Sequence, residues 1–192
     1  FLKDTGFDGI SVVSAIFASD DCALATRKLF VKTRELFGKK RNIIMDMDGT
    51  LADSMPFWKK SAREYAILRG ADIPDNFDEI TGVMDLNDYA EYVKNVLGID
   101  TNLEQITEAA VEIMNKHYEK DIPAKDGMTE LVTREYEAGS RLVVFTASDR
   151  RSVEILLSHL GIRECFYDIY TVYDVGLKKS DKNSYLKVAE LA

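Results

Sequence analysis

The chain has 192 residues, enough for one sizeable hydrophobic core or for one domain and part of another. Hydrophobic residues make up 46% of it and charged residues 30%, as in ordinary soluble globular proteins. Its 33 acidic and 25 basic residues give a net charge of -8, which argues against a surface for nucleic acid or for an anionic membrane.

The two cysteines, Cys22 and Cys165, lie far apart in the chain and in largely apolar surroundings. This favours buried thiols in a reducing compartment over a disulfide. No apolar run approaches the roughly 20 residues of a membrane span, and the N-terminus lacks the pattern of a secretory signal. We therefore expect a cytoplasmic protein.

The first 38 residues predict one β/α unit ahead of the main domain. Residues 10–13 include a short apolar strand, and a helix with apolar residues follows it. The helix ends at Gly38, before three basic residues and the first strong strand, so we place a domain boundary there. The expected domains are residues 1–38 and residues 39–192.

Three segments of the second domain predict the strands of a parallel sheet. Residues 43–47 and 142–145 are continuously apolar, as strands covered on both faces are, and residues 168–172 alternate. Between the last two strands, residues 148–161 have the apolar spacing of a helix and a glycine at its end. Strand, helix and strand in this order predict an α/β fold with a right-handed crossover.

Residues 56–120 predict helices and no convincing strand. Trp58, Ala62 and Tyr65 share one helical face, and apolar residues recur at helical spacing again over residues 103–117. We therefore expect a helical insertion after the first strand of the sheet.

The segment NIIMDMDGTL, residues 42–51, runs an apolar strand into two aspartates. Asp46 and Asp48 lie two positions apart, so their side chains emerge on one side at the carboxyl edge of the sheet, where such sheets place their chemistry. Gly49 permits a tight turn, in which free N–H groups around Gly49 and Thr50 can face an anion. Two adjacent carboxylates repel unless a cation lies between them, and Mg²⁺ prefers oxygen ligands together with phosphate. The pattern predicts a metal-assisted phosphoryl site; the alternative is a solvated Asx turn.

The same residues resemble the first motif of the haloacid dehalogenase superfamily of phosphohydrolases, and the likeness extends over residues 41–192. By this resemblance Asp46 is the nucleophile that takes the phosphoryl group as an aspartyl phosphate. Asp48 is the acid that protonates the leaving oxygen and then the base that activates water. Both aspartates are implied ligands of Mg²⁺. The resemblance also implies a Rossmann-like parallel-sheet core with a helical cap, here at about residues 54–125.

The second motif of that superfamily, an apolar strand that ends in Thr or Ser, is similar to LVVFTAS at residues 142–148. By the resemblance Thr146 donates its hydroxyl to the phosphoryl oxygens, with the N–H of Ala147 beside it. A helix N-cap at Ser148 or Asp149 is compatible with this role.

The third motif is a lysine near the start of a helix, which neutralises the nucleophile and the phosphate. The resemblance places it at Lys179, while Lys178 and Lys182 stay as alternatives because Ser180 and Lys182 stand where prolines are common. The fourth motif, an acidic pair that completes the Mg²⁺ site, is expected shortly after residue 192, so we expect the domain to be truncated before it.

Residues 1–38 are similar to a different family, the carboxyl end of thiamine phosphate synthase. The segment VVSAIF, an acidic pair and a following helix match the last unit of a (β/α)₈ barrel, in which the turn around Ser14 holds the phosphate of the product. A barrel needs about 250 residues, so residues 1–38 can form only its final unit. A synthase fused to a phosphatase suggests that the phosphatase acts on thiamine monophosphate.

The sequence therefore predicts a Mg²⁺-dependent phosphatase whose partner is a small phosphorylated metabolite, with no nucleic-acid or membrane partner. One alternative is a sugar-phosphate phosphatase or a phosphomutase similar to β-phosphoglucomutase, because the same cap subclass serves both. An alternative of another class is a non-catalytic binding or scaffold module. The oligomeric state stays open.

Overall fold

The computed structural model describes residue 28, residues 41–84 and residues 86–192. The chain divides into two compact units, one made of Phe1–Asp53 and Pro123–Ala192 and the other of Ser54–Ile122. We call the first the core unit and the second the cap unit. The β/α unit predicted for residues 1–38, including Ser14 and Cys22, lies outside the described residues except for Lys28.

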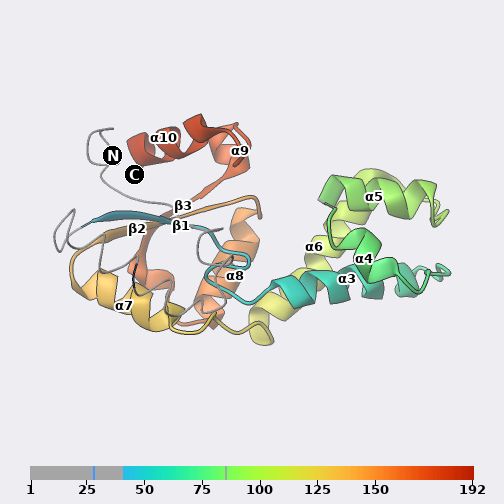
Figure 1. Ribbon diagram of the computed structural model, residues 1–192, viewed down its shortest axis with the longest axis horizontal. Coiled ribbons are helices and arrows are strands. Elements are labelled where there is room, and N and C mark those ends of the chain that lie inside the picture. Colours follow the sequence, from blue (N-terminus) through green and yellow to red (C-terminus); the bar gives the residue numbers. More distant parts are fainter. Residues whose placement is uncertain (1–27, 29–40, 85) are drawn as a thin grey trace. The chain divides into compact units, whose positions relative to one another are not determined.

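The core unit contains a parallel sheet with the strand order β1-β2-β3 (Figure 1). The strands are β1 (Asn42–Met45), β2 (Arg141–Thr146) and β3 (Phe166–Thr171). β2 and β3 are joined through α8 (Arg150–His159) and the short 3-10 helix η2 (Arg163–Cys165). All three strands run in the same direction, so their carboxyl ends meet at one edge of the sheet.

Helices cover both faces of this sheet. α9 (Val172–Val175) and α10 (Lys182–Leu191) lie over one face, and α7 (Met128–Glu137) and α8 lie over the other (Figure 1). On the α9 and α10 side, buried strand residues pack with buried helix residues in one cluster: Val143, Phe145, Tyr170, Val175 and Val188. The predicted α/β class with a parallel sheet and a helical insertion is therefore confirmed.

β1 differs from the strand predicted for residues 43–47. It ends at Met45, and Ile43 and Ile44 are half-buried rather than covered on both faces. Among the described strands β1 pairs only with β2. Met47 is fully buried, but it belongs to the turn after the strand, because its carbonyl accepts hydrogen bonds from the turn instead of a ladder.

The cap unit is helical. It contains α3 (Met55–Leu68), α4 (Phe77–Thr81), α5 (Leu86–Asn95) and α6 (Leu103–Lys120). Their apolar faces form one core, made of Tyr65, Ala66, Phe77, Tyr89, Ala90, Val93, Ile106, Ala110 and Ile113. The Tyr89 hydroxyl donates to the Ala62 carbonyl at 2.7 Å, which ties α5 to α3 inside this core.

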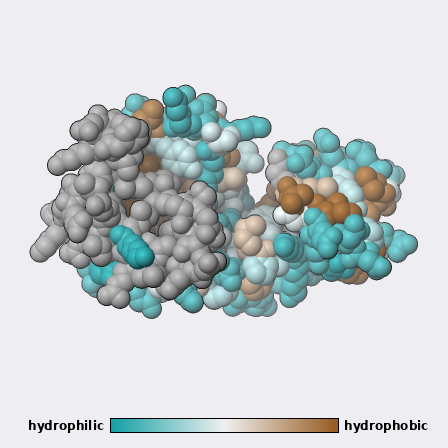
Figure 2. Space-filling view, viewed as in Figure 1, coloured by the Kyte–Doolittle hydropathy of each residue, from teal (hydrophilic) through white to brown (hydrophobic). Residues whose placement is uncertain are grey.

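Some hydrophobic side chains of the cap unit lie outside this core. Leu103, predicted on the apolar face of α6, is exposed because it is the first residue of the helix. Ile67, Leu68, Val83 and Val96 are also exposed, and hydrophobic surface is visible on this unit in Figure 2.

Two further expectations concern the described residues alone. Cys165, predicted as a buried thiol, is a half-buried free thiol at the end of η2, and burial raises the pKa of that thiol. None of the described helices combines the length and the apolar character that crossing a bilayer requires.

Candidate active site

The loop after β1 is built around the Met47 carbonyl. This carbonyl accepts the N–H groups of Thr50 at 3.2 Å, Leu51 at 2.9 Å and Ala52 at 3.1 Å. Met47 and Leu51 are fully buried and anchor the loop in the core unit. Gly49 takes a positive φ of 72°, which a residue with a Cβ rarely adopts, so glycine suits this turn.

This turn corrects one expectation. The N–H groups of Gly49 and Thr50 are not free to face an anion: Gly49 N–H donates to the Ala52 carbonyl at 2.9 Å, and Thr50 N–H donates to Met47. The turn needs both donors to close on itself. The Thr50 hydroxyl is buried and has no hydrogen-bond partner within the described part of the chain.

Asp46 follows β1 directly and meets Lys179. Lys179 Nζ lies 2.5 Å from Asp46 Oδ1, and the two side chains are 23% and 13% exposed. The Met47 N–H also donates to Asp46 Oδ1 at 2.9 Å. Burial raises the pKa of the Asp46 carboxyl, while the Lys179 ammonium and the Met47 N–H oppose that rise and the charge of Asp48 adds to it.

Lys179 lies in the turn between α9 and α10. Asp181 caps α10 and accepts the Asn183 N–H at 2.9 Å, which fixes where the helix begins. Lys178 and Lys182, the two alternatives for the third motif, are exposed. Of the three lysines, Lys179 is the one whose ammonium is in contact with Asp46.

Thr146 is the last residue of β2 and is only 1% exposed. Its hydroxyl oxygen accepts the Ser148 N–H at 3.1 Å. The exposed Ala147 lies between them. Asp149 is the residue that caps α8, because its side chain accepts the Ser152 N–H at 3.0 Å.

Because Asp149 caps α8, the hydroxyl of Ser148 is available for another contact. It donates to Asp48 Oδ2 at 2.6 Å and so joins the loop after β2 to the loop after β1. Sequence reasoning treated Ser148 only as a possible cap. The available signal was the pair of adjacent cap-forming residues, of which a helix uses one.

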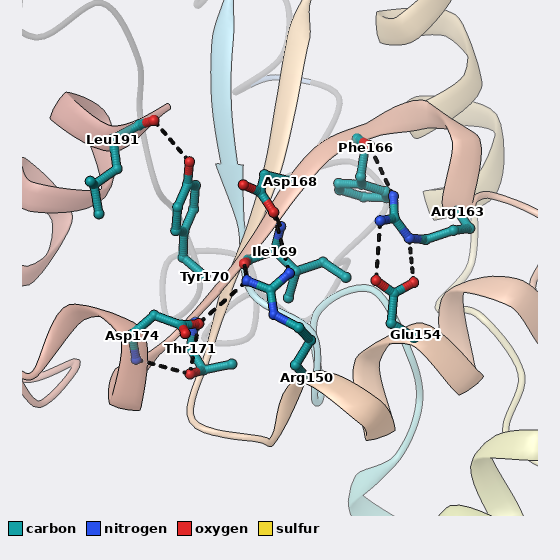
Figure 3. Close-up of polar contacts among 10 residues, drawn as sticks. All are labelled: Arg150, Glu154, Arg163, Phe166, Asp168, Ile169, Tyr170, Thr171, Asp174 and Leu191. Carbon is teal, nitrogen blue, oxygen red and sulfur yellow. Dashed lines mark hydrogen bonds and ion pairs between the residues drawn. The ribbon is translucent and has the colours of Figure 1, made fainter.

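Arg150, the first residue of α8, holds this helix against the end of β3 (Figure 3). Its guanidinium donates to Asp168 Oδ1 at 3.3 Å and to the Ile169 carbonyl, and it lies 3.6 Å from Asp174 Oδ2. Asp174 in turn closes a capping box with Thr171 at the start of α9. One charged side chain thus links α8 to β3 and to α9.

The residues from the three motifs form two contact groups in the core unit. One joins Asp46 to Lys179, and the other joins Asp48 through Ser148 to Thr146. Transfer of a phosphoryl group uses groups of these kinds: an anionic oxygen nucleophile, a carboxyl group, a hydroxyl donor and an ammonium. Ser14 lies outside the described residues.

Residues 43–192 match the sequence model of a known family, the haloacid dehalogenase-like hydrolases. The chain belongs to this family. Membership confirms the resemblance seen in the motifs and the expectation of an enzyme with phosphatase-type chemistry. No curated protein matches the chain.

Several solved structures are similar to the present one. A protein from Thermotoga maritima, provisionally assigned as a β-phosphoglucomutase, is 21% identical with a TM-score of 0.65, over 77% of this chain and 68% of that one. CbbY from Rhodobacter sphaeroides, in complex with phosphate, is 24% identical with a TM-score of 0.65, over 78% and 72%. The hydrolase YfnB from Bacillus subtilis, bound to magnesium, is 16% identical with a TM-score of 0.63, over 80% and 74%. These likenesses establish the fold.

Proposed function

We propose that the protein is a Mg²⁺-dependent phosphomonoester hydrolase in which Asp46 is the nucleophile. The contact between Lys179 Nζ and Asp46 Oδ1 carries the proposal. A half-buried carboxylate beside one ammonium keeps a charged oxygen for attack on phosphorus, and the same ammonium can neutralise a phosphoryl oxygen. The loops after β1 and β2 bring the remaining groups to this end of the sheet.

The two aspartates have different roles in the proposed reaction. An Asp46 oxygen bonds to phosphorus while the ester P–O bond breaks, and the leaving oxygen takes a proton from Asp48. A water molecule then attacks the phosphorus of the aspartyl phosphate and gives its proton to Asp48. The P–O bond to Asp46 breaks and inorganic phosphate leaves. Thr146 donates its hydroxyl to the phosphoryl oxygens in both steps.

Asp46 and Asp48 would hold Mg²⁺. Their donor set fits this ion, because Mg²⁺ is usually bound by one or two carboxylates with phosphate and water as further ligands. Burial raises the pKa of Asp46 in spite of Lys179, so a second cation would favour its charged form. Among the described residues there is no group of three or more His, Cys, Asp or Glu, so this part of the chain would contribute Asp46 and Asp48, with phosphate and water as further ligands. Bound Mg²⁺ would neutralise charge on the phosphoryl oxygens.

The proposed substrate is thiamine monophosphate. Support comes from residues 1–38, whose sequence resembles the end of thiamine phosphate synthase. An enzyme that forms this phosphate ester, joined to one that cleaves phosphate esters, gives consecutive steps in one polypeptide. On this proposal the partner is a small phosphorylated metabolite in the cytoplasm.

A second candidate is a phosphatase or phosphomutase for a sugar phosphate. The similar structures favour it, since one is assigned as a β-phosphoglucomutase and CbbY has also been solved with xylulose-1,5-bisphosphate. A mutase returns a phosphorylated isomer, whereas a phosphatase returns inorganic phosphate. A third candidate, a non-catalytic binding or scaffold module, requires no contact between Asp46 and Lys179.

The test is release of inorganic phosphate by the full-length protein with Mg²⁺. Thiamine monophosphate is compared with a panel of sugar and nucleotide monophosphates, and Asp46→Asn is the control. We expect thiamine monophosphate to be preferred and Asp46→Asn to abolish release. Preference for another ester would overturn the substrate, phosphorylated isomers would favour the mutase, and absence of any Asp46-dependent release would favour the scaffold.

A further inference from the structure

We propose that Ser148 is a positioning residue that orients the Asp48 carboxyl for proton transfer to the leaving oxygen. This inference rests on the proposed phosphatase function, in which Asp48 is the acid. It assigns a role to a residue that is not among the four catalytic positions that sequence reasoning selected.

The contact is short and comes from a fixed point. Ser148 Oγ donates to Asp48 Oδ2 at 2.6 Å, at the short end of the range for O–H···O hydrogen bonds. The main chain of Ser148 is held at the same time, because its N–H donates to Thr146 Oγ1 at 3.1 Å. Thr146 is almost fully buried at the end of β2, so Ser148 is fixed relative to the sheet.

The next residues strengthen this arrangement. Asp149 caps α8, and its carboxylate accepts both the N–H of Ser152 at 3.0 Å and the hydroxyl of Ser152. Arg150 fastens the first turn of α8 to the Ile169 carbonyl and to Asp168 (Figure 3). The hydroxyl of Ser148 therefore extends from a segment that is tied to β2, to α8 and to β3.

The position of Asp48 differs from that of Ser148. It lies in the turn after β1, beyond the end of the strand, and is half-buried. A carboxyl that transfers a proton must have the right direction as well as the right position, and small misplacements of reacting groups can lower a rate about 10²-fold. One strong hydrogen bond from a fixed donor supplies that direction before substrate binds.

Leaving-group chemistry separates this role from a structural one. A nitrophenolate leaves phosphorus without needing a proton, whereas an alkoxide needs the proton of an acid. A residue that acts through Asp48 must therefore affect alkyl esters much more than nitrophenyl esters. A residue that binds phosphate, or only maintains the fold, must affect both esters equally.

The experiment compares kcat/KM for p-nitrophenyl phosphate and for the best alkyl phosphate of the panel, with saturating Mg²⁺. This constant reports the steps up to transfer of the phosphoryl group to Asp46, so later hydrolysis does not mask the effect. The variants are Ser148→Ala, which removes the side-chain donor but keeps the N–H to Thr146, and Ser148→Thr, which keeps a hydroxyl. Ser158→Ala, the same change at an exposed position of α8, is the matched control.

We expect Ser148→Ala to lower kcat/KM about 10- to 100-fold for the alkyl ester and less than about 3-fold for the nitrophenyl ester. Ser148→Thr should recover most of the loss, and Ser158→Ala should match the parent. In an Asp48→Asn background, Ser148→Ala should have no further effect on the alkyl ester. Thermal unfolding of Ser148→Ala should match that of the parent.

Three results would overturn the proposal: equal losses for both esters, no loss for the alkyl ester, or a full further loss in the Asp48→Asn background. Equal losses with a raised KM would mean that Ser148 binds the phosphoryl group itself. If the parent protein shows no release that depends on Asp46, the phosphatase function fails and this inference fails with it. If the parent is active and Ser148→Ala changes nothing, only the inference about Ser148 fails.

Discussion

Lys179 Nζ lies 2.5 Å from Asp46 Oδ1, so the turn before α10 is in contact with the loop after β1. Burial of Asp46 disfavours its charged form and raises its pKa, and the Lys179 ammonium lowers that pKa again. The nucleophile of the proposed reaction therefore depends on Lys179 for its ionisation as well as for neutralising the phosphate.

Lys179→Ala should lower kcat/KM for phosphate release about 10²–10³-fold, because a preorganised charge is removed from the site. Loss of the ammonium also raises the pKa of Asp46, so the acidic limb of the pH profile of kcat/KM should move to higher pH. Lys178→Ala is the matched control, since Lys178 is exposed and next in sequence. An acidic limb that stays in place would contradict this account of Asp46.

The core of the cap unit should respond to a single large-to-small substitution. Ile106 is fully buried, so Ile106→Ala should lower the free energy of unfolding of this unit by about 2–5 kcal/mol. Trp58, the sole tryptophan, lies in α3, and its fluorescence during urea unfolding reports on this unit. Leu103→Ala, an exposed position on the same helix, should leave the midpoint almost unchanged. Equal shifts for the two variants would refute the assigned core.

The sheet was predictable because a parallel strand covered on both faces leaves a continuous apolar run, as in β2. The residue at which β1 ends was not predictable, because an apolar residue such as Met47 can be buried in a strand or in a turn. Hydrogen bonding decides between them: three N–H groups of the following loop close on the Met47 carbonyl. The same closure uses the Gly49 and Thr50 donors that the sequence suggested were free.

In the candidate site, too, the sequence pattern predicted some features, and others became clear only from the structure. The motifs selected Asp46, Asp48 and Thr146 by residue type and spacing, and the structure places them at the carboxyl ends of β1 and β2. The motif position favoured Lys179 and left Lys178 and Lys182 as alternatives; in the structure Lys179 has the contact with Asp46. Nor could sequence tell that Asp149 caps α8 and leaves the Ser148 hydroxyl for Asp48, because both residue types form good caps.

A buried ion pair at the start of β1 should make the core unit sensitive to loss of one charge. Arg41 and Glu135 pair with side chains that are 4% and 2% exposed, and the Ser140 hydroxyl donates to Glu135 Oε2 at 2.8 Å. Glu135→Gln removes the carboxylate from this buried ion pair and should cost about 3–5 kcal/mol in the free energy of unfolding.

The double variant Arg41→Met with Glu135→Leu removes both charges and should lose much less than Glu135→Gln alone. Chemical denaturation of the core unit, followed by far-UV circular dichroism, measures the difference. If the single variant unfolds at the same denaturant concentration as the parent, the pair does not stabilise the fold.

The capping box of α9 should give stability that depends on pH. Asp174 Oδ2 accepts the Thr171 N–H at 2.8 Å and the Thr171 hydroxyl at 2.9 Å. The backbone hydrogen bond is the main reason that the pKa of Asp174 is lowered, and Arg150 contributes to the lowering while burial opposes it. Because the folded-state pKa is below the unfolded value, this stabilisation is present above a pH of about 3.9 and is lost as the pH falls through the lower folded value.

Asp174→Asn should therefore lower the melting temperature at neutral pH, by an amount that corresponds to less than about 1 kcal/mol because the Asp174 side chain is 42% exposed. Thermal unfolding of the parent and the variant, measured from neutral pH downwards, tests this. The difference in melting temperature should close once the pH falls below the usual range of an aspartate, where the parent carboxyl also becomes neutral. A difference that keeps the same size at low pH would show that the amide disturbs packing, and that the charge of Asp174 does not stabilise α9.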